Sequence, residues 1–378
     1  MEVEAKPGLT PAPDRLRVLD LLRFVAAIAV VTHHFTGVYW EPWGGDSRLI
    51  FPSLSPLTRL GYLGVDLFFV ISGFVILMSA WGRRPGDFAV SRVSRLFPAY
   101  WFSVVLALVV ITATGLSDGK QDILQRFFPN LTMLQEGLRA GSMENVYWSL
   151  WVELHFYALI MLLVWRGVTY ARCMAFMAGW LLLGAFAMEG GLGTLTAILI
   201  PTYAPYFVAG MAFFLIYRFG SNLGPWLMVA ICWALSVHHA RQGVHPWQAW
   251  PGVQDWAIPA VITAIYLIFV LVATHRLDRI DWRGFTVAGA VTYPLYLIHQ
   301  TVARPLIDRL YPALDGRLVL AIALATVLVA AYLVYRFIED PAQRRMRAML
   351  RNAADHIRSA DPPTTAPAKR PAPAVSPR

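Results

Sequence analysis

Charge is scarce in this chain. Only 15% of its 378 residues are Asp, Glu, Lys or Arg, whereas 57% are hydrophobic. A soluble globular protein carries about 25% charged and about 45–50% apolar residues. The mean hydropathy of +0.52 agrees with this imbalance. The composition excludes an ordinary soluble domain and predicts an integral membrane protein, since no polar stretch is long enough to fold by itself.

Cysteine is also rare. The chain has two, Cys173 and Cys232, and each lies in an apolar run. Their spacing matches neither a disulfide framework nor a metal site. We therefore interpret both as small buried hydrophobic residues, and we expect no metal site.

What the sequence does have is apolar runs of about 20 residues, the length that spans a bilayer. They predict an all-α integral membrane protein, a polytopic bundle of about ten transmembrane helices. Arg23 interrupts the first run and no small-residue cleavage site follows closely, so we expect a retained helix rather than a signal peptide. The expected spans are residues 17–38, 59–80, 97–115, 147–165, 171–188, 195–217, 222–238, 255–274, 286–304 and 317–337.

The loop arginines predict the orientation. With the N-terminus inside, the inner loops hold more Lys and Arg than the outer loops, as membrane proteins prefer. Both termini are then cytoplasmic. The same arginines account for the net charge of +9 without nucleic acid as a partner. We predict a membrane domain at residues 1–345 and a disordered cytoplasmic tail at 346–378, which is rich in Pro, Ala and charge.

Polar residues inside the apolar spans indicate a site, because each costs a few kcal/mol in hydrocarbon. Arg23 and His34 are eleven residues apart, close to three helical turns, so we expect them on one face about 16 Å apart. The topology brings His34, Asp66, Glu153 and His299 to a similar depth near the outer side. An imidazole near a carboxylate is typical of general-base activation of a hydroxyl.

Arginines mark the opposite, inner side. Arg92 and Arg95 are three residues apart and share a helical face, and Arg23 lies at a similar depth. Clustered arginines suit a phosphorylated ligand. Simpler interpretations stay open: Arg92 and Arg95 are also typical positive-inside anchors, and Asp66 is also typical of a charge at a helix N-terminus. A proton-coupled transporter of sugars or lipid-linked glycans needs the same residue types.

Six ordered motifs favour one interpretation. They are RVLDLLRFVAAIAVVTHHF, GVDLFFVISGF, SRVSRLFPAY, WSLWVELHFY, TYPLYLIHQ and FIEDPAQR. They resemble the landmarks of the membrane acyltransferases called acyltransferase family three, over about residues 15–345. The resemblance implies a ten-helix inner-membrane enzyme that moves an acyl group, commonly acetyl, from cytoplasmic acyl-CoA to a hydroxyl of a carbohydrate or another natural product. Acyl-CoA is then a donor substrate, and no cofactor is held permanently.

The resemblance also implies roles for single residues. Its critical arginine and histidine match Arg23 and His34, its paired arginines match Arg92 and Arg95, and its serine-to-glutamate element matches Ser149 and Glu153. The family pattern usually has serine where Thr292 stands, and often another acid at Leu154. Because the histidine is doubled, the ten-residue spacing favours His34 over His33.

We therefore expect Arg92, Arg95 and Arg23 to hold the phosphates of acyl-CoA. We expect His34 to take the proton of the acceptor hydroxyl, with Glu153 orienting or charging it and Asp66 as a third catalytic residue. Further substrate-binding or structural residues are predicted at Ser72, Ser149, Tyr293 and His299.

Overall fold

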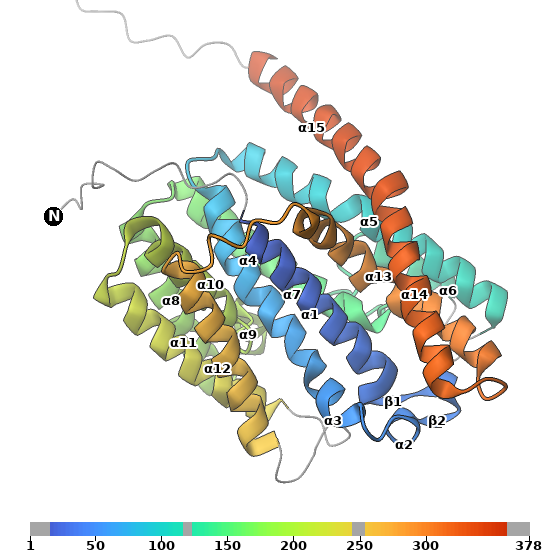
Figure 1. Cartoon of the computed structure of the whole chain (residues 1–378). Coiled ribbons are helices and arrows are strands. Elements are labelled where there is room, and N and C mark those ends of the chain that lie inside the picture. The colour runs from blue at the N-terminus through green and yellow to red at the C-terminus, as the bar shows by residue number, and fades with distance from the viewer. Residues whose placement is uncertain (1–15, 116–122, 244–253, 361–378) are drawn as a thin grey trace, which may run out of the picture.

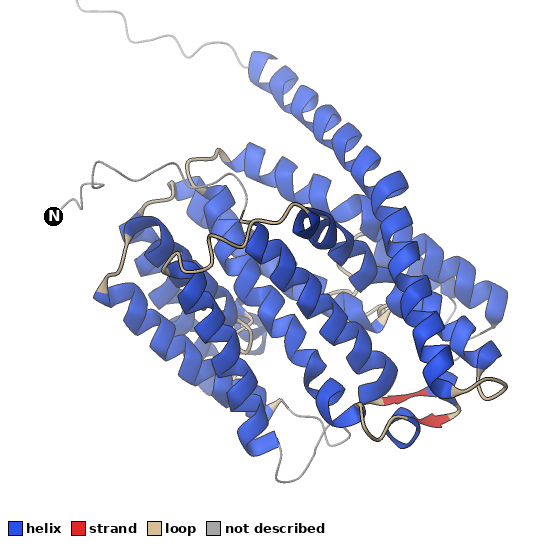
Figure 2. Cartoon of the chain, in the orientation of Figure 1, coloured by secondary structure: helices blue, strands red, loops and turns tan. Residues whose placement is uncertain are grey.

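The computed structural model describes residues 16–115, 123–243 and 254–360 (Figure 1). These residues form a helical bundle with one short hairpin, as Figure 2 shows. The long helices are α1 (Arg17–Thr32), α4 (Gly64–Ala80), α5 (Pro85–Thr114), α7 (Trp148–Arg166), α8 (Tyr170–Glu189), α10 (Ala204–Phe219), α11 (Leu223–Gln242), α12 (Gln254–Ala273), α13 (Gly284–Leu310), α14 (Gly316–Val334) and α15 (Asp340–Ala360). The shorter helices are α2 (Ser47–Ile50), α3 (Ser55–Thr58), α6 (Ile123–Leu131) and α9 (Gly193–Leu199).

Short segments of other helix types join or extend these elements. They are π-helices at His33–Gly37 and Tyr335–Glu339, and 3₁₀ helices at Glu41–Trp43, Arg59–Leu63 and Asn145–Tyr147. Strand β1 (Tyr39–Trp40) pairs antiparallel with β2 (Gly45–Asp46), with Tyr39 opposite Asp46. We call the end of the bundle with these strands the hairpin end, and the opposite end, where α15 projects, the α15 end (Figure 1).

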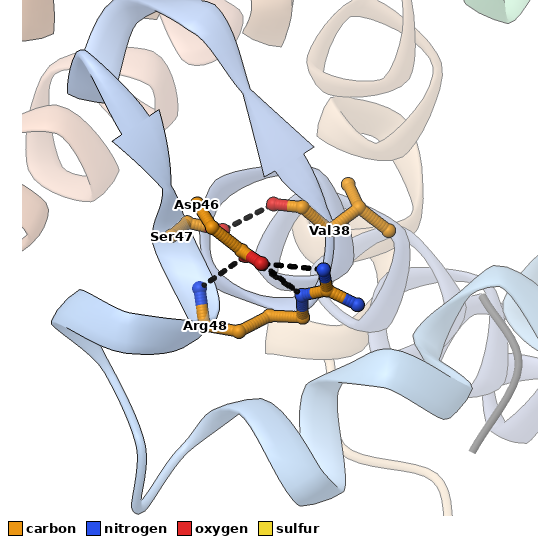
Figure 3. A network of polar contacts seen from close by, with 4 residues as sticks. All are labelled: Val38, Asp46, Ser47 and Arg48. Atoms are coloured by element: carbon orange, nitrogen blue, oxygen red, sulfur yellow. Dashed lines mark hydrogen bonds and ion pairs between the residues drawn. The ribbon is translucent and has the colours of Figure 1, made fainter. Parts of the chain in front are cut away.

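A polar network closes the hairpin end (Figure 3). The carboxylate of Asp46 caps α2 by accepting a hydrogen bond from the backbone N–H of Arg48 (3.0 Å), and the Arg48 Nε donates to it at 2.7 Å. The hydrogen bond from the Arg48 side chain holds the pKa of Asp46 below its usual value. The Ser47 hydroxyl donates to the Val38 carbonyl. The connection between α1 and α3 is therefore an ordered cap.

Helix α4 packs between α1 and α10 at the centre of the bundle. Two glycines let α4 and α10 approach closely, since a Cβ at Gly73 would lie 2.1 Å from the carbonyl oxygen of Phe207. A Cβ at Gly210 would lie 2.1 Å from the carbonyl oxygen of Val70. Small residues at such crossings are typical of membrane helices, whose association depends on close packing.

The all-α membrane class is confirmed. Among the described residues, nine helices or helical pairs are long and apolar enough to cross a membrane, and they correspond to nine of the ten expected spans. The remaining expected span, 286–304, is α13, which has the length to cross but is more polar than the nine. Helix α13 packs against α1 and α14. The count of ten crossings stays a prediction.

Two boundaries differ from the expectation. The single span expected at 195–217 is broken into α9 and α10 at Ile200, which has a φ of +43°. The cause is Pro201, which lacks an N–H and disfavours helical geometry in the residue before it. Helix α5 begins at Pro85 and not near residue 97, because proline suits a first helical position. Arg92 and Arg95 therefore lie within α5 rather than before it.

The C-terminal region also extends further than expected as helix. Helix α15 continues across residue 345, where the sequence predicts the end of the membrane domain, and reaches Ala360. Residues 361–378 of the expected tail lie outside the described residues. Helix α1 begins at the α15 end of the bundle (Figure 1), so both ends of the described chain lie on one side.

Candidate active site

A cavity opens among α1, α4, α5, α7 and α13, and most of the residues predicted for the site line it. Its polar lining includes predicted arginines, hydroxyls and one carboxylate. The lining residues are Arg23, Val65, Phe68, Phe69, Ser72, Ile76, Arg92, Arg95, Leu96, Ser149, Leu150, Glu153, Tyr157, Gly289, Thr292, Tyr293 and Tyr296. We call this space the arginine cavity.

Glu153 is the central carboxylate of the arginine cavity. Its Oε1 accepts hydrogen bonds from the Ser72 hydroxyl (3.0 Å) and from the Tyr157 hydroxyl (2.6 Å). Tyr157 follows Glu153 by four residues on α7, so the two side chains share one helix face. Both donors use the same oxygen, which leaves Oε2 available to a ligand in the cavity.

The three arginines of the cavity differ in how they are held. Arg95 Nη1 forms an ion pair with Oε1 of the buried Glu339 at 3.0 Å. Arg23 lies 3.9 Å from Asp20, which is 4% exposed and packs against Gly289 of α13. The Arg95–Glu339 pair connects α5 to the π-helix that follows α14, whereas Arg23 and Asp20 both lie on α1, and it is the packing of Asp20 against Gly289 that links α1 to α13.

Arg92 has a buried hydrogen-bond donor that the protein does not use. Its Nη2 donates to the Ser91 hydroxyl at 2.9 Å, and its guanidinium lies 5.9 Å from the ring centre of Tyr157. Its Nε is buried and has no hydrogen-bond acceptor among the described residues. An unsatisfied buried donor is uncommon in proteins and requires an explanation. An anionic ligand in the cavity would supply the missing acceptor.

His34 lies in the π-helical turn after α1, and its partner is His299 of α13. Nδ1 of His34 is 3.1 Å from Nε2 of His299. Nδ1 of His299 faces the carbonyl oxygens of Tyr296 (2.8 Å) and Leu295 (3.2 Å). Carbonyls only accept, so this Nδ1 carries the hydrogen, and Nε2 of a neutral His299 is an acceptor.

The same reasoning fixes the tautomer of His34. Its Nδ1 must donate to His299, so the unprotonated nitrogen of a neutral His34 is Nε2. A nitrogen with a free lone pair is the group that a general base needs. His33 points elsewhere: its Nδ1 lies 3.1 Å from the Thr58 carbonyl oxygen, and its ring packs against Tyr62.

Two expected associations are corrected. The described contacts give His34 a hydrogen bond with His299 and not with Glu153, which binds Ser72 and Tyr157 instead. Depth along the bundle predicted that these residues lie at one level, but the rotation of each helix decides which side chains meet. Asp66 lies on another side of α4, close to Tyr206 of α10, whose hydroxyl donates to the Ser236 carbonyl at 3.3 Å.

The remaining predicted residues hold helices together. The Ser149 hydroxyl lies 2.6 Å from the Tyr296 hydroxyl, which joins α7 to α13. The Tyr293 hydroxyl donates to the Leu96 carbonyl at 3.0 Å, which joins α13 to α5. Both contacts lie at the cavity wall, so these residues shape the cavity whether or not they touch a ligand.

Sequence reasoning missed Tyr157 and Glu339 as partners of the site. The signal for Tyr157 was its position four residues after Glu153. The signal for Glu339 was its place in the motif FIEDPAQR, whose contact with Arg95 joins residues 244 positions apart and requires the tertiary structure.

A second, polar cavity lies toward the hairpin end of α13. On α13 its lining includes Gln300, the residue after His299. On α7 its lining includes Trp148, the residue before Ser149. The Thr301 hydroxyl donates to Oε1 of Glu144 at 2.5 Å in its wall. The lining residues are Val110, Ile111, Thr114, Ile123, Arg126, Glu136, Ser142, Met143, Glu144, Asn145, Trp148, Gln300, Thr301 and Arg304. We call this space the hairpin-end cavity. His299 thus lies between the two cavities along α13.

The fold and the site together define a multi-pass helical membrane protein with an arginine-lined cavity and a histidine pair, neither of whose rings lines that cavity. Comparison with known families gives the same class a name. The chain matches the family model described as an acyltransferase domain over residues 16–336. The chain therefore belongs to this acyltransferase family, which confirms the resemblance carried by its motifs.

Individual relatives are more distant. Acyltransferase MdmB of Streptomyces mycarofaciens is 28% identical over 160 residues, 39% of this chain and 39% of MdmB. YrhL of Bacillus subtilis (strain 168), named as a candidate peptidoglycan O-acetyltransferase, is 28% identical over 37% of this chain and 22% of YrhL. The exopolysaccharide production protein ExoZ of Rhizobium meliloti (strain 1021) is 32% identical over 26% of this chain and 33% of ExoZ. The chain thus spans less than half the length of the curated relatives it matches. No solved structure matches it.

Proposed function

We propose that this protein is a membrane-embedded O-acyltransferase that moves an acyl group, commonly acetyl, from cytoplasmic acyl-CoA to a hydroxyl of a carbohydrate or a glycosylated natural product. The observation that carries the proposal is the arginine cavity. It combines three guanidinium groups with a carboxylate whose Oε2 is available, and two of the helices that line it lead to the histidine pair: His34 follows α1, and His299 lies on α13. Membership of the acyltransferase family supports the same activity.

The donor end of the reaction uses the arginines. Arg92 offers its buried, unsatisfied Nε to a phosphate oxygen, and Arg95 adds a second cation on the same face of α5. Guanidinium groups bind phosphate with paired, charge-assisted hydrogen bonds. The acyl-pantetheine arm then extends from these arginines toward His34.

The chemistry follows from the tautomer of His34. Nε2 takes the proton of the acceptor hydroxyl as its oxygen attacks the thioester carbonyl. The C–S bond breaks, and the sulfur of CoA leaves and takes the proton back from the imidazolium. The products are an ester and CoA with a free thiol. His299 acts as a positioning residue, because it accepts from Nδ1 of His34 and stabilises the charge that His34 gains.

The lining of the hairpin-end cavity supports a glycan as the acceptor. Trp148 offers an apolar ring face, and Glu136, Glu144, Asn145 and Gln300 offer hydrogen-bonding groups, which is the mixture that suits a sugar. The names of ExoZ and YrhL refer to exopolysaccharide and peptidoglycan, which are also glycans. We propose that the acceptor reaches His34 through this cavity, from the outer side of the inner membrane, and that both termini are cytoplasmic.

The test is turnover of acetyl-CoA by the purified protein, measured as release of free CoA thiol. It is combined with mass spectrometry of surface glycans and secreted metabolites from a deletion strain and from the same strain with the gene restored. We expect turnover, and loss of O-acetyl groups from one class of product in the deletion strain. A proton-coupled carrier would show no turnover and no loss of acyl groups, and would contradict the proposal.

A further inference from the structure

Helix α15 carries an arginine on the face where an apolar residue is expected. The helix packs against α5 and then projects beyond it (Figure 1). Its half-buried residues Gln343, Met346, Arg347 and Leu350 recur at helical spacing, whereas Arg344 is exposed. Arg347 therefore lies on the packed face of α15, beside α5, and not on the solvent face.

This position brings like charges together. Arg347 is within electrostatic range of Arg83, Arg92 and Arg95, and of Arg351 in its own helix. Glu339 and Asp340, the carboxylates at the start of this region, are already paired with Arg95 at 3.0 Å and Arg344 at 2.9 Å. In the described part of the chain, no carboxylate lies within ion-pair distance of Arg347.

Such an arrangement is unfavourable without a counter-charge, because like charges repel more strongly where water is partly excluded. The repulsion disappears when an anion lies between the two helices. An anion between α5 and α15 would therefore stabilise this arrangement.

The arginines fall into two groups along the expected path of the donor. Arg92 and Arg95 line the arginine cavity, whereas Arg83, which precedes the start of α5, and Arg347 of α15 are not among its lining residues. Coenzyme A carries two separate anionic groups: a diphosphate next to the pantetheine arm, and a 3′-phosphate on the ribose beyond it. The inner group of arginines matches the diphosphate, and the outer group matches the more distant phosphate.

We propose that Arg347, together with Arg83, binds the ribose 3′-phosphate of the CoA donor. This inference rests on the proposed function, since it assigns one part of the acyl-CoA site. It makes α15 a part of the donor site, and it gives the protein a means to distinguish CoA from 3′-dephospho-CoA.

The experiment is calorimetric titration of the purified full chain with CoA and with 3′-dephospho-CoA. The variants are Arg347→Gln and, as a matched control on the same helix, Arg344→Gln, whose guanidinium is exposed and paired with Asp340. We expect the parent protein to bind CoA at least about tenfold more tightly than 3′-dephospho-CoA. Arg347→Gln should remove this difference by weakening CoA alone, and Arg344→Gln should preserve it. Unchanged melting temperatures in detergent establish that both variants are folded.

Several outcomes overturn the inference. Equal affinity of the parent protein for the two ligands means that the 3′-phosphate is not recognised, although the proposed function survives. Equal weakening of both ligands by Arg347→Gln means that Arg347 acts elsewhere. If the parent protein binds neither ligand, the proposed acyl-CoA donor fails and the inference fails with it.

The phosphate of an anionic lipid headgroup is a second anion that arginines at this position would bind. Titrations in nanodiscs of phosphatidylcholine, with and without phosphatidylglycerol, separate the two sources. We expect Arg347→Gln to lower the affinity for CoA about tenfold in both lipid compositions. If Arg347 binds a lipid headgroup instead, Arg347→Gln leaves the affinity for CoA unchanged and reduces the phosphatidylglycerol that copurifies with the protein.

Discussion

Nδ1 of His34 and Nε2 of His299 lie 3.1 Å apart, although 265 residues separate them in the chain. His299 is fixed in turn by two backbone carbonyls of its own helix. Nδ1 of His34 donates to His299, and Nδ1 of His299 donates to the carbonyls, so Nε2 of His34 remains as the basic nitrogen. A hydrogen bond that sets the tautomer of a catalytic imidazole is a common feature of histidine catalysis.

The first prediction concerns the doubled histidine. His34→Ala should lower acyl transfer by about a hundredfold or more, because a general base contributes on the order of 10²–10⁴ in rate. His33→Ala should keep substantial activity, since His33 bonds the Thr58 carbonyl. Acyl content of products from a complemented deletion strain measures both, with protein levels checked by immunoblot. An inactive His33→Ala beside an active His34→Ala would reverse the assignment.

The second prediction separates positioning from packing at His299. His299→Gln offers a side-chain oxygen that can accept from Nδ1 of His34, whereas His299→Phe fills the space without an acceptor. We expect the Gln variant to keep about tenfold more transfer activity than the Phe variant. Acyl-CoA affinity, measured by calorimetry on the purified proteins, should be unchanged in both. If the two variants lose activity equally and melt at equally lowered temperatures, His299 is only a packing residue.

The third prediction concerns the arginine pair of α5. Arg92→Gln should weaken acyl-CoA binding by about ten- to a hundredfold, the equivalent of about 1.5–3 kcal/mol for a charge-assisted contact. Arg92→Lys should rescue this only in part, because lysine lacks the planar fork of donors. Arg95→Gln should weaken binding too, and it also leaves the buried Glu339 without its partner. Acyl-CoA titrations that do not change in either variant would make the pair a topology anchor.

The fourth prediction is about sidedness. Arg23 and His34 are separated by eleven residues of helix, about 16 Å, a distance that an extended pantetheine arm can cover. In oriented vesicles, acyl-CoA should support transfer only when it is supplied on the side that bears the C-terminus, and the product should appear on the opposite side. Equal activity with the donor on the other side, or a product formed only on the donor side, would favour a cytoplasmic reaction followed by export.

The fifth prediction concerns stability at the crossing of α4 and α10. Gly73→Ala and Gly210→Ala should each strongly reduce folded protein, since the new methyl carbon would lie 2.1 Å from a backbone oxygen of the other helix. The matched control is Gly179→Ala in α8, where nothing lies within 4 Å of the new atom. Melting temperature and monodispersity in detergent measure the effect. Parent-like melting of Gly73→Ala would mean that the two helices can separate without cost.

Much of this architecture followed from local properties of the sequence. Apolar runs of membrane length predicted the nine helices or helical pairs that, among the described residues, are long and apolar enough to cross a bilayer, because the bilayer imposes a fixed length on any helix that crosses it. The exceptions are local as well. Pro201 breaks one expected helix. Helix α5 begins at Pro85, but its first turns carry charged residues, so the length of the apolar run alone does not predict this start.

The site was predicted only in part. The sequence indicated Arg23, Arg92, Arg95, Ser72 and Glu153 by their cost in a membrane, and all of them line the arginine cavity. It could not indicate which of these side chains meet, because depth along a helix says nothing about the rotation of that helix around its axis.

The sequence by itself determined that the chain is a membrane protein, which residues are unusual in its helices and to which family it belongs, because hydropathy, charge and motifs are properties of short segments. Only the tertiary structure decided that His34 pairs with His299, that Glu153 pairs with Ser72 and Tyr157, and that Asp66 faces α10. These contacts depend on how helices from distant parts of the chain rotate and pack, and close packing fixes that rotation only when all of them are assembled.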